Sequence, residues 1–108
     1  MSKLFKIDGR LEVPEDGWYL VEKLDIIGKM EVTEKFTDDG GDEIYKVDIH
    51  DCRTRLDLNT LLGELWDADV FWCKITFTDK NFDHYIELDG DEGQYSIDTD
   101  YSDNSEKL

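Results

Sequence analysis

Carboxylates dominate the last quarter of the chain. Between Asp79 and Glu106 there are ten acidic residues and one cation, Lys80. Paired carboxylates can perform general acid–base chemistry, as in glycoside hydrolysis, where two of them flank the scissile bond. In a chain with 28 acidic residues, however, close pairs arise by chance. No glycine-rich phosphate loop, nucleophile elbow or dinucleotide fingerprint accompanies them. We therefore predict that the protein is not an enzyme.

The acidic residues instead have the spacing of a β surface. Side chains of a strand point alternately to its two faces, and every second residue lies about 6.6 Å further along. Strands are predicted at 84–89 and 94–99, with Ile86, Leu88, Tyr95 and Ile97 inward. The acids Glu87, Asp89 and Asp91 share the outward parity of the first strand, and Asp98 and Asp100 repeat the pattern after a turn. Two such strands would present negative charges with a spacing similar to that of phosphates. The predicted partner-binding residues are Asp79, Asp83, Glu87, Asp89, Asp91, Glu92, Asp98 and Asp100.

Cysteine, zinc and calcium chemistry have weaker support. The Cys and His inventory is Cys52, Cys73, His50 and His84, without the paired spacing of a zinc site. His50 and Cys52 share strand parity and are expected on one side, but the net charge of −16 opposes a reactive thiolate. Cys73 is expected in the core. No EF-hand loop fits, although an irregular calcium site at 38–42 or 89–92 stays open as an alternative. We predict no metal and no cofactor.

The net charge builds toward the C-terminus. Residues 1–36 carry −2, residues 37–66 carry −5 and residues 67–108 carry −9. A polyanion repels nucleic acid and anionic membranes, so neither is expected as a direct ligand. A basic protein is the favoured partner, because complementary fields steer association. Solubility alone is the alternative explanation for the charge.

The length of 108 residues indicates one domain, which we place at 1–100, with a frayed acidic tail at 101–108. No signal peptide and no segment of transmembrane length are recognised. Two cysteines do not make a disulfide framework. These features predict a cytoplasmic protein with reduced thiols, in a bacterium or an infected host cell. Its oligomeric state does not follow from the sequence.

The first third of the chain is predicted to be all β. Residues 4–13 read as a hairpin around Asp8-Gly9, because Asp-Gly favours a two-residue type I′ turn. A second turn is predicted at 14–17, where Pro14 and Gly17 favour chain reversal. Residues 18–27 are apolar on both parities and read as a central strand, and Gly28 is expected to mark a bulge.

The remaining elements have clearer patterns. Strands at 29–37 and 43–51 are expected to pair antiparallel across the loop 38–42, with Met30, Val32, Phe36, Tyr45, Val47 and Ile49 inward. The only predicted helix spans 57–66, because Asp57 can cap it and Leu58, Leu61, Leu62 and Leu65 form one apolar stripe. An apolar strand at 70–78 and the final hairpin follow.

These elements predict an α+β domain, mostly antiparallel β, with seven to eight strands in successive hairpins and one short helix. A five-stranded barrel with an inserted helix is the alternative. In size and charge the chain resembles phage-encoded DNA-mimic inhibitors, such as anti-CRISPR and anti-restriction proteins. This likeness is one of composition and carries over no residues. The charge pattern predicts an inhibitor that occupies the cationic site of a nucleic-acid-handling protein. The alternatives are an immunity protein that neutralises a basic toxin and a structural acidic domain.

Overall fold

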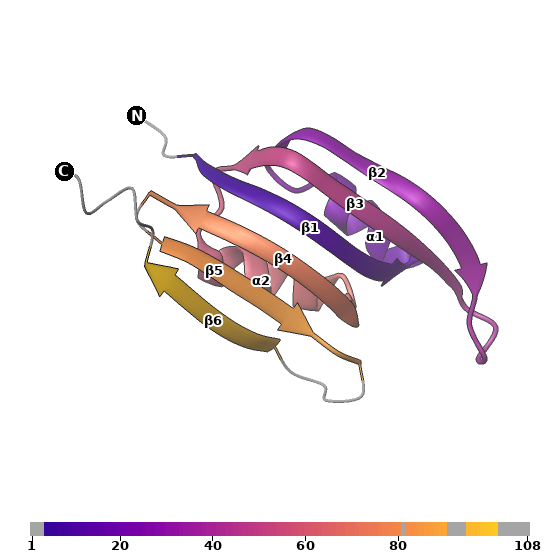
Figure 1. Ribbon diagram of the computed structural model, residues 1–108. Coiled ribbons are helices and arrows are strands. Elements are labelled where there is room, and N and C mark those ends of the chain that lie inside the picture. Colours follow the sequence, from indigo (N-terminus) through magenta and orange to yellow (C-terminus); the bar gives the residue numbers. More distant parts are fainter. Residues whose placement is uncertain (1–3, 81, 91–94, 102–108) are drawn as a thin grey trace.

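The computed structural model describes residues 4–80, 82–90 and 95–101. The elements are β1 (Phe5–Pro14), α1 (Glu15–Glu22), β2 (Ile26–Thr37), β3 (Glu43–Thr54), α2 (Leu58–Asp67), β4 (Trp72–Asp79), β5 (Phe82–Leu88) and β6 (Tyr95–Tyr101). The strands form one antiparallel sheet in the order β2-β3-β1-β4-β5-β6, with β1 inside it (Figure 1). The antiparallel class is confirmed. The barrel is wrong, because the described strands form an open sheet with β2 and β6 at its edges.

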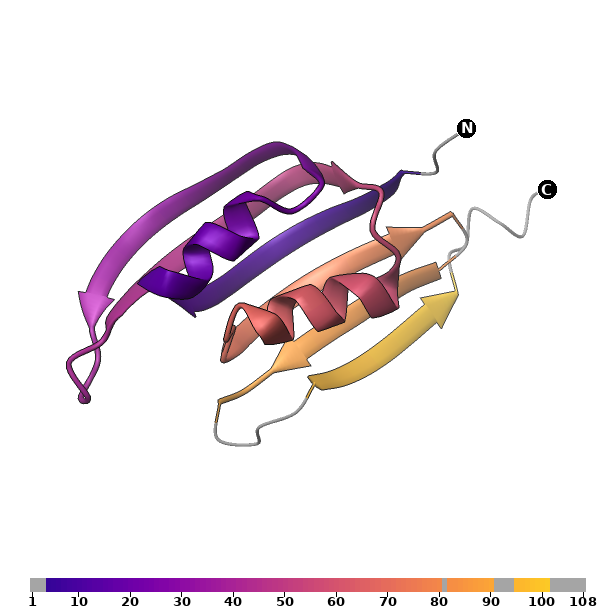
Figure 2. The same cartoon turned by 180° about the vertical axis from the view of Figure 1, so that it is seen from behind.

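Both helices lie on the same face of the sheet, which leaves the opposite face uncovered in the described part of the chain (Figure 2). We call this opposite face the open face. Every other residue of the inner strands points toward the helices and is buried there. The core contains Phe5, Ile7, Leu11, Val13, Val21, Val47, Ile49, Cys52, Leu61, Leu65, Ala68, Val70, Cys73, Ile75, Phe77, Ile86 and Leu88. Two layers of this kind bury one sheet face and one stripe of each helix.

The predicted helix is confirmed as α2. The Asp57 carboxylate accepts a hydrogen bond from the backbone N–H of Thr60 at 2.8 Å, which satisfies one free donor of the first turn. Leu61 and Leu65 are buried, and the other two leucines of the stripe are half-buried. A ten-residue helix is marginal alone in water, so this packing supplies its stability. Neither helix in the described residues has the length or apolar character needed to cross a bilayer.

The hairpin predicted at 4–13 is wrong, because β1 runs straight through Asp8 and Gly9. Gly9 has φ +144°, and a Cβ built there would lie 2.1 Å from the carbonyl oxygen of Lys74 in β4. The glycine therefore permits close approach of a neighbouring strand, and it does not form a turn. The register with β3 shifts between Ile7 and Gly9, which marks a bulge. The bulge predicted at Gly28 is confirmed by a similar register shift in β2.

The predicted turn at 14–17 and strand at 18–27 are also wrong, because most of this segment forms α1. Pro14 precedes the helix with φ −61°, a backbone angle compatible with helix entry. Glu15 and Asp16 occupy the first turn, where the helix dipole favours negative charge. The apolar residues that suggest a two-sided strand are those of a helix that has one face against the sheet.

The second helix explains the lower number of strands. Six strands occur in the described residues, compared with the predicted seven to eight, because the hairpin merges into β1 and the next strand is α1. Gly17 lets α1 approach the end of α2, since a Cβ there would lie 1.8 Å from the carbonyl oxygen of Ala68. Val21 then enters the core beside them.

The antiparallel pairing of β2 with β3 across residues 38–42 is confirmed. Val47 and Ile49 are buried toward the helices as predicted, and Val32 pairs with Val47 on that face. Phe36 is an exception. A register shift between Val32 and Glu34 moves the rest of β2 to the other parity, so Phe36 pairs with Ile44 on the open face. A one-residue slip of this kind reverses every following side chain.

Candidate functional site

Three predicted binding residues meet on the open face of the β5–β6 hairpin. Asp83 and Glu87 lie four residues apart in β5 and therefore share a face. Asp98 pairs with Tyr85 in β6 and lies on that same face between them. Ile86 points the other way and is fully buried. We call Asp83, Glu87 and Asp98 the acidic band.

The other predicted binding residues do not all join this band. Asp79 ends β4 and Asp89 follows β5, so both lie at strand ends. Asp100 pairs with Asp83 in the β5–β6 register. Asp91 and Glu92 lie outside the described residues, as does the predicted tail from residue 102 on, whereas residue 101 ends β6.

The inward residues of the hairpin follow the predicted parity. Ile86 and Leu88 are buried, and Tyr95 is half-buried. Ile97 points to the helix side but stays 41% exposed. The reason is that α2 lies over β4 and β5 and not over the edge strand β6 (Figure 2).

The spacing of the acidic band can be compared with that of nucleic acid. Four residues of strand cover about 13 Å. Over that length one DNA strand presents about four phosphates and a duplex about eight. Asp83 and Glu87 mark the two ends of this length, and Asp98 lies beside its middle. The acidic band therefore approaches the charge density of one nucleic-acid strand and not that of a duplex.

The acidic band also differs from the rest of the open face in its charge balance. Several acids nearer β1, β2 and β3 pair with cations: Arg10 with Asp48 at 3.8 Å, Lys46 with Glu34 at 3.1 Å, and Arg53 with Asp51 at 3.0 Å, although no ion pair involves Glu12 or Glu31 among the described residues. Within residues 4–80, 82–90 and 95–101, the three acids of the acidic band make no ion pair within 4 Å. The open face is thus balanced at β1 and β3 and negative at β5 and β6.

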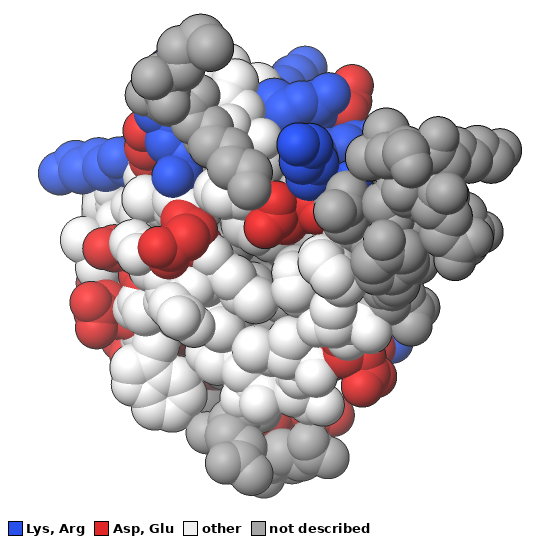
Figure 3. All heavy atoms as spheres, turned by 90° about the vertical axis from the view of Figure 1, so that its left-hand side faces the viewer, with Lys and Arg blue, Asp and Glu red and all other residues white. Residues whose placement is uncertain are grey.

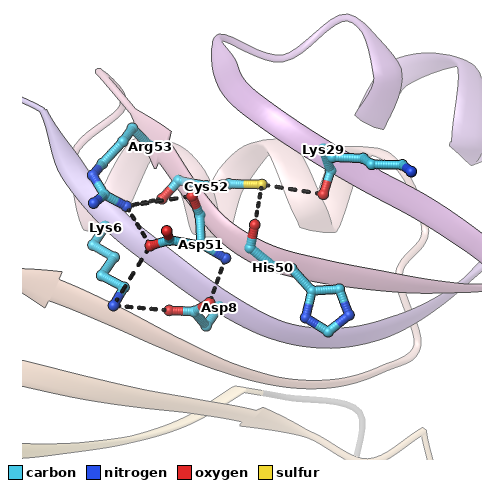
Figure 4. Close-up of polar contacts among 7 residues, drawn as sticks. All are labelled: Lys6, Asp8, Lys29, His50, Asp51, Cys52 and Arg53. Atoms are coloured by element: carbon cyan, nitrogen blue, oxygen red, sulfur yellow. Dashed lines mark hydrogen bonds and ion pairs between the residues drawn. The ribbon is translucent and has the colours of Figure 1, made fainter.

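The best-connected polar cluster holds the bulge between β1 and β3 (Figure 4). The backbone N–H of Asp51 donates to the carboxylate of Asp8 at 2.5 Å, and Asp51 itself has φ +50°. The Asp51 carboxylate lies 3.0 Å from Arg53 and 3.6 Å from Lys6. These cations, Arg53 foremost, lower the pKa of Asp51 and keep it ionised. Two acids and two cations balance here, so the cluster fixes backbone geometry and presents little net charge.

His50 and Cys52 do not lie on one side of β3, so that prediction is wrong. The bulge separates them: the His50 ring is exposed beside Asp48, whereas Cys52 is fully buried (Figure 4). The Cys52 thiol donates to the carbonyl oxygen of Lys29 at 3.4 Å, and burial raises the pKa of this thiol. Cys73 is buried as predicted, and its pKa is raised to about 12 by burial. No cluster of three or more potential metal ligands occurs among the described residues.

Acidic side chains are not confined to the acidic band. Figure 3 views the end of the molecule at which β1 begins and β6 ends. Acidic groups lie at several places around an uncharged area there, and basic groups gather toward the upper part. The net charge of −16 gives the molecule a long-range negative field, to which the acidic band and the acids at this end both contribute.

Trp66 is the last residue of the predicted helix 57–66, and the structure places it at the surface with 56% exposure. Its signal in the sequence was its place one residue beyond the leucine stripe of α2, at the margin of the buried face. Trp72 is half-buried in β4.

No family model, curated protein or solved structure matches this chain. Its function therefore has to be inferred from the chemistry of its surface.

Proposed function

We propose that the protein is a small inhibitor that binds a basic, nucleic-acid-handling protein and occupies the cationic site of that protein. The observation that carries this proposal is the acidic band, whose three carboxylates lack ion pairs in the described residues and share one uncovered strand pair. A cationic cleft would meet them over about 13 Å, as it meets one strand of nucleic acid. The role is a binding role without catalysis or cofactor.

The rigidity of the hairpin supports the proposal. β5 and β6 pair over their full length, from Phe82 with Tyr101 to Leu88 with Tyr95. Ile86 and Leu88 anchor β5 in the core. Charges fixed on such a platform lose little conformational freedom when a partner binds, which favours affinity.

The electrostatics support it in two further ways. Acids that share a strand face repel one another, and a cationic partner relieves that repulsion. The remaining acids contribute a long-range field that speeds encounter with a basic protein and repels other polyanions. Direct binding of nucleic acid is opposed by the same field.

Affinity capture with a matched pair of variants tests the proposal. The band variant carries Asp83→Asn, Glu87→Gln and Asp98→Asn. The control variant carries Glu31→Gln, Asp39→Asn and Asp42→Asn, which removes the same charge from exposed positions in β2 and in the loop between β2 and β3. Captures from lysate at about 50 mM and about 500 mM salt separate electrostatic binding from other binding.

The expected result is a basic nucleic-acid-binding protein that the wild type and the control variant retain at low salt and lose at high salt. The band variant should fail to retain this basic protein at either salt concentration. Captured proteins that are neither basic nor nucleic-acid-binding would contradict the proposal, as would equal capture by the two variants.

A further inference from the structure

A cavity of about 280 Å³ opens beside the C-terminal end of α2. Its lining residues are Trp66, Asp69, Val70, Phe71, Leu88 and Gly90. Small-molecule sites in proteins usually measure about 300–1,000 Å³. The cavity is therefore just below that range, a size that suits a single side chain better than a cofactor.

The lining combines apolar walls with an exposed aromatic ring and a carboxylate. The Trp66 indole is 56% exposed, and its position is held by an edge-on contact with the Tyr95 ring at 6.1 Å between centroids. Leu88 and Val70 form buried walls, and Asp69 is exposed. An indole face and a carboxylate attract cations, and the apolar walls accommodate methylene groups.

The end of α2 lacks the charge that helix ends usually have. Free carbonyl groups give a helix C-terminus a partial negative charge, which Lys, Arg or His in the last turn normally offset. The last turn of α2 contains no basic residue. Glu64, Asp67 and Asp69 lie at this end instead. The cavity is thus located where a cation is electrostatically favoured.

The backbone at Asp69 supplies a third, independent observation. Asp69 has φ +62°, and its N–H donates to the carbonyl oxygen of Trp66 at 3.0 Å, so it occupies the left-handed position that follows a helix. Glycine is the usual residue there. Compared with glycine, an aspartate is less favourable there, because its side chain disfavours the left-handed conformation and its charge repels the negative end of the helix dipole. The position after the helix thus places a carboxylate in the lining of the cavity, where a glycine would place no side chain.

We infer that this cavity binds an arginine side chain of the basic partner. The guanidinium group would stack on Trp66 and pair with Asp69, and its methylene groups would contact Val70 and Leu88. The inference rests on the proposed function, because the basic partner supplies the arginine. Leu88 and Glu87 point to opposite faces of β5, so the cavity and the acidic band lie on different sides of the hairpin. An arginine on a flexible segment of the partner would reach the cavity, and the two sites can be tested separately.

NMR titration of the full ¹⁵N-labelled chain with N-acetyl-arginine amide tests the inference. The expected response is a saturable shift of the Trp66 indole signal and of the Asp69 and Gly90 amides, with a dissociation constant on the order of 10 mM. The neutral isostere N-acetyl-citrulline amide should bind at least about tenfold more weakly. A Trp66→Phe variant assigns the indole signal.

Matched variants locate the site. Asp69→Asn keeps a residue that tolerates the left-handed conformation and removes the charge, so affinity should fall about fivefold or more while Tm stays equal or rises. Asp67→Asn removes the same charge outside the cavity lining and should change affinity less than about twofold. The band variant should bind the probe about as well as the wild type.

Three results would overturn the inference: no saturable shift up to about 50 mM probe, equal binding of the citrulline analogue, or equal losses in Asp69→Asn and Asp67→Asn. Each would leave the acidic band untouched. Conversely, an intact arginine response in a protein that captures no basic partner would refute the proposed function and not the cavity.

Discussion

Replacing Gly9 with alanine should destabilise the sheet near its centre. Gly9 lies in β1 between β3 and β4, with φ +144°, a conformation that residues with a side chain rarely adopt. An added Cβ would lie 2.1 Å from the carbonyl oxygen of Lys74 and 2.7 Å from the Cα of Ile75. Both atoms belong to the backbone of β4, so no side-chain rotation relieves the overlap.

Two terms give the expected loss in the free energy of unfolding of Gly9→Ala. The backbone conformation costs about 1–3 kcal/mol, and overpacking typically adds about 1–3 kcal/mol. The loss of about 2–6 kcal/mol is large compared with a total free energy of unfolding of about 5–15 kcal/mol for a domain. Urea unfolding followed by tryptophan fluorescence measures it from the midpoint and slope.

Two other glycines separate the terms. Gly41 has φ +87° with nothing within 4 Å of an added Cβ, so Gly41→Ala carries only the conformational term. Gly63 is inside α2 with nothing within 4 Å, so Gly63→Ala should stabilise the protein by up to about 1 kcal/mol. If Gly9→Ala and Gly41→Ala agree within about 0.5 kcal/mol, β1 and β4 do not approach as described and the reasoning fails.

Three further predictions concern the fold. The hydrogen bond from the Thr60 N–H lowers the folded-state pKa of Asp57. The Asp57 carboxylate therefore stabilises the fold fully above its unfolded pKa of about 3.9, and this stabilisation is lost as pH falls through the folded-state pKa. The difference in Tm between wild type and Asp57→Ala should shrink in acid, and a difference that stays constant with pH would contradict the prediction. Burial raises the pKa of the Cys52 thiol, and it raises that of the Cys73 thiol to about 12. A thiol reagent at pH 8 should therefore label neither cysteine until the protein unfolds. Rapid labelling of the folded protein would contradict this prediction. Leu61 is 1% exposed, so Leu61→Ala should lower the free energy of unfolding by about 2–5 kcal/mol, as measured by urea unfolding. A loss below about 1 kcal/mol would contradict the place of Leu61 in the core.

The elements that the sequence predicts well are those with local signals. Asp57 followed by a leucine stripe defines α2, because both the cap and the 3.6-residue period are contained in the helix itself. The β5–β6 hairpin is predictable because Glu87 alternates with Ile86 and Leu88, and such a period of two residues fits a strand and not a helix.

The elements that it predicts poorly depend on distant contacts. Asp8-Gly9 has the sequence of a tight turn, and only the approach of Lys74 explains why Gly9 lies inside a strand. Pro14 followed by Glu15 and Asp16 is a local signal for the start of α1, but the apolar residues on both parities of the following segment favour a strand.

The candidate site shows the same limit. Parity assigns Glu87 and Asp98 to one face, and the structure agrees. The ion pairs that neutralise other acids depend on the strand order, since Arg10 in β1 pairs with Asp48 only because β3 is its neighbour. Sequence spacing therefore could not distinguish the balanced part of the open face from the acidic band.

The most direct test of the central claim is displacement of a fluorescent nucleic acid from the captured basic protein, followed by anisotropy. The wild type should displace it competitively, and the control variant should do so within about threefold, since it changes only the distant field. The band variant should need at least about tenfold more protein, which is about 1.4 kcal/mol of lost contact. If nucleic acid and protein bind together, or if the two variants weaken equally, the acidic band does not occupy a nucleic-acid site.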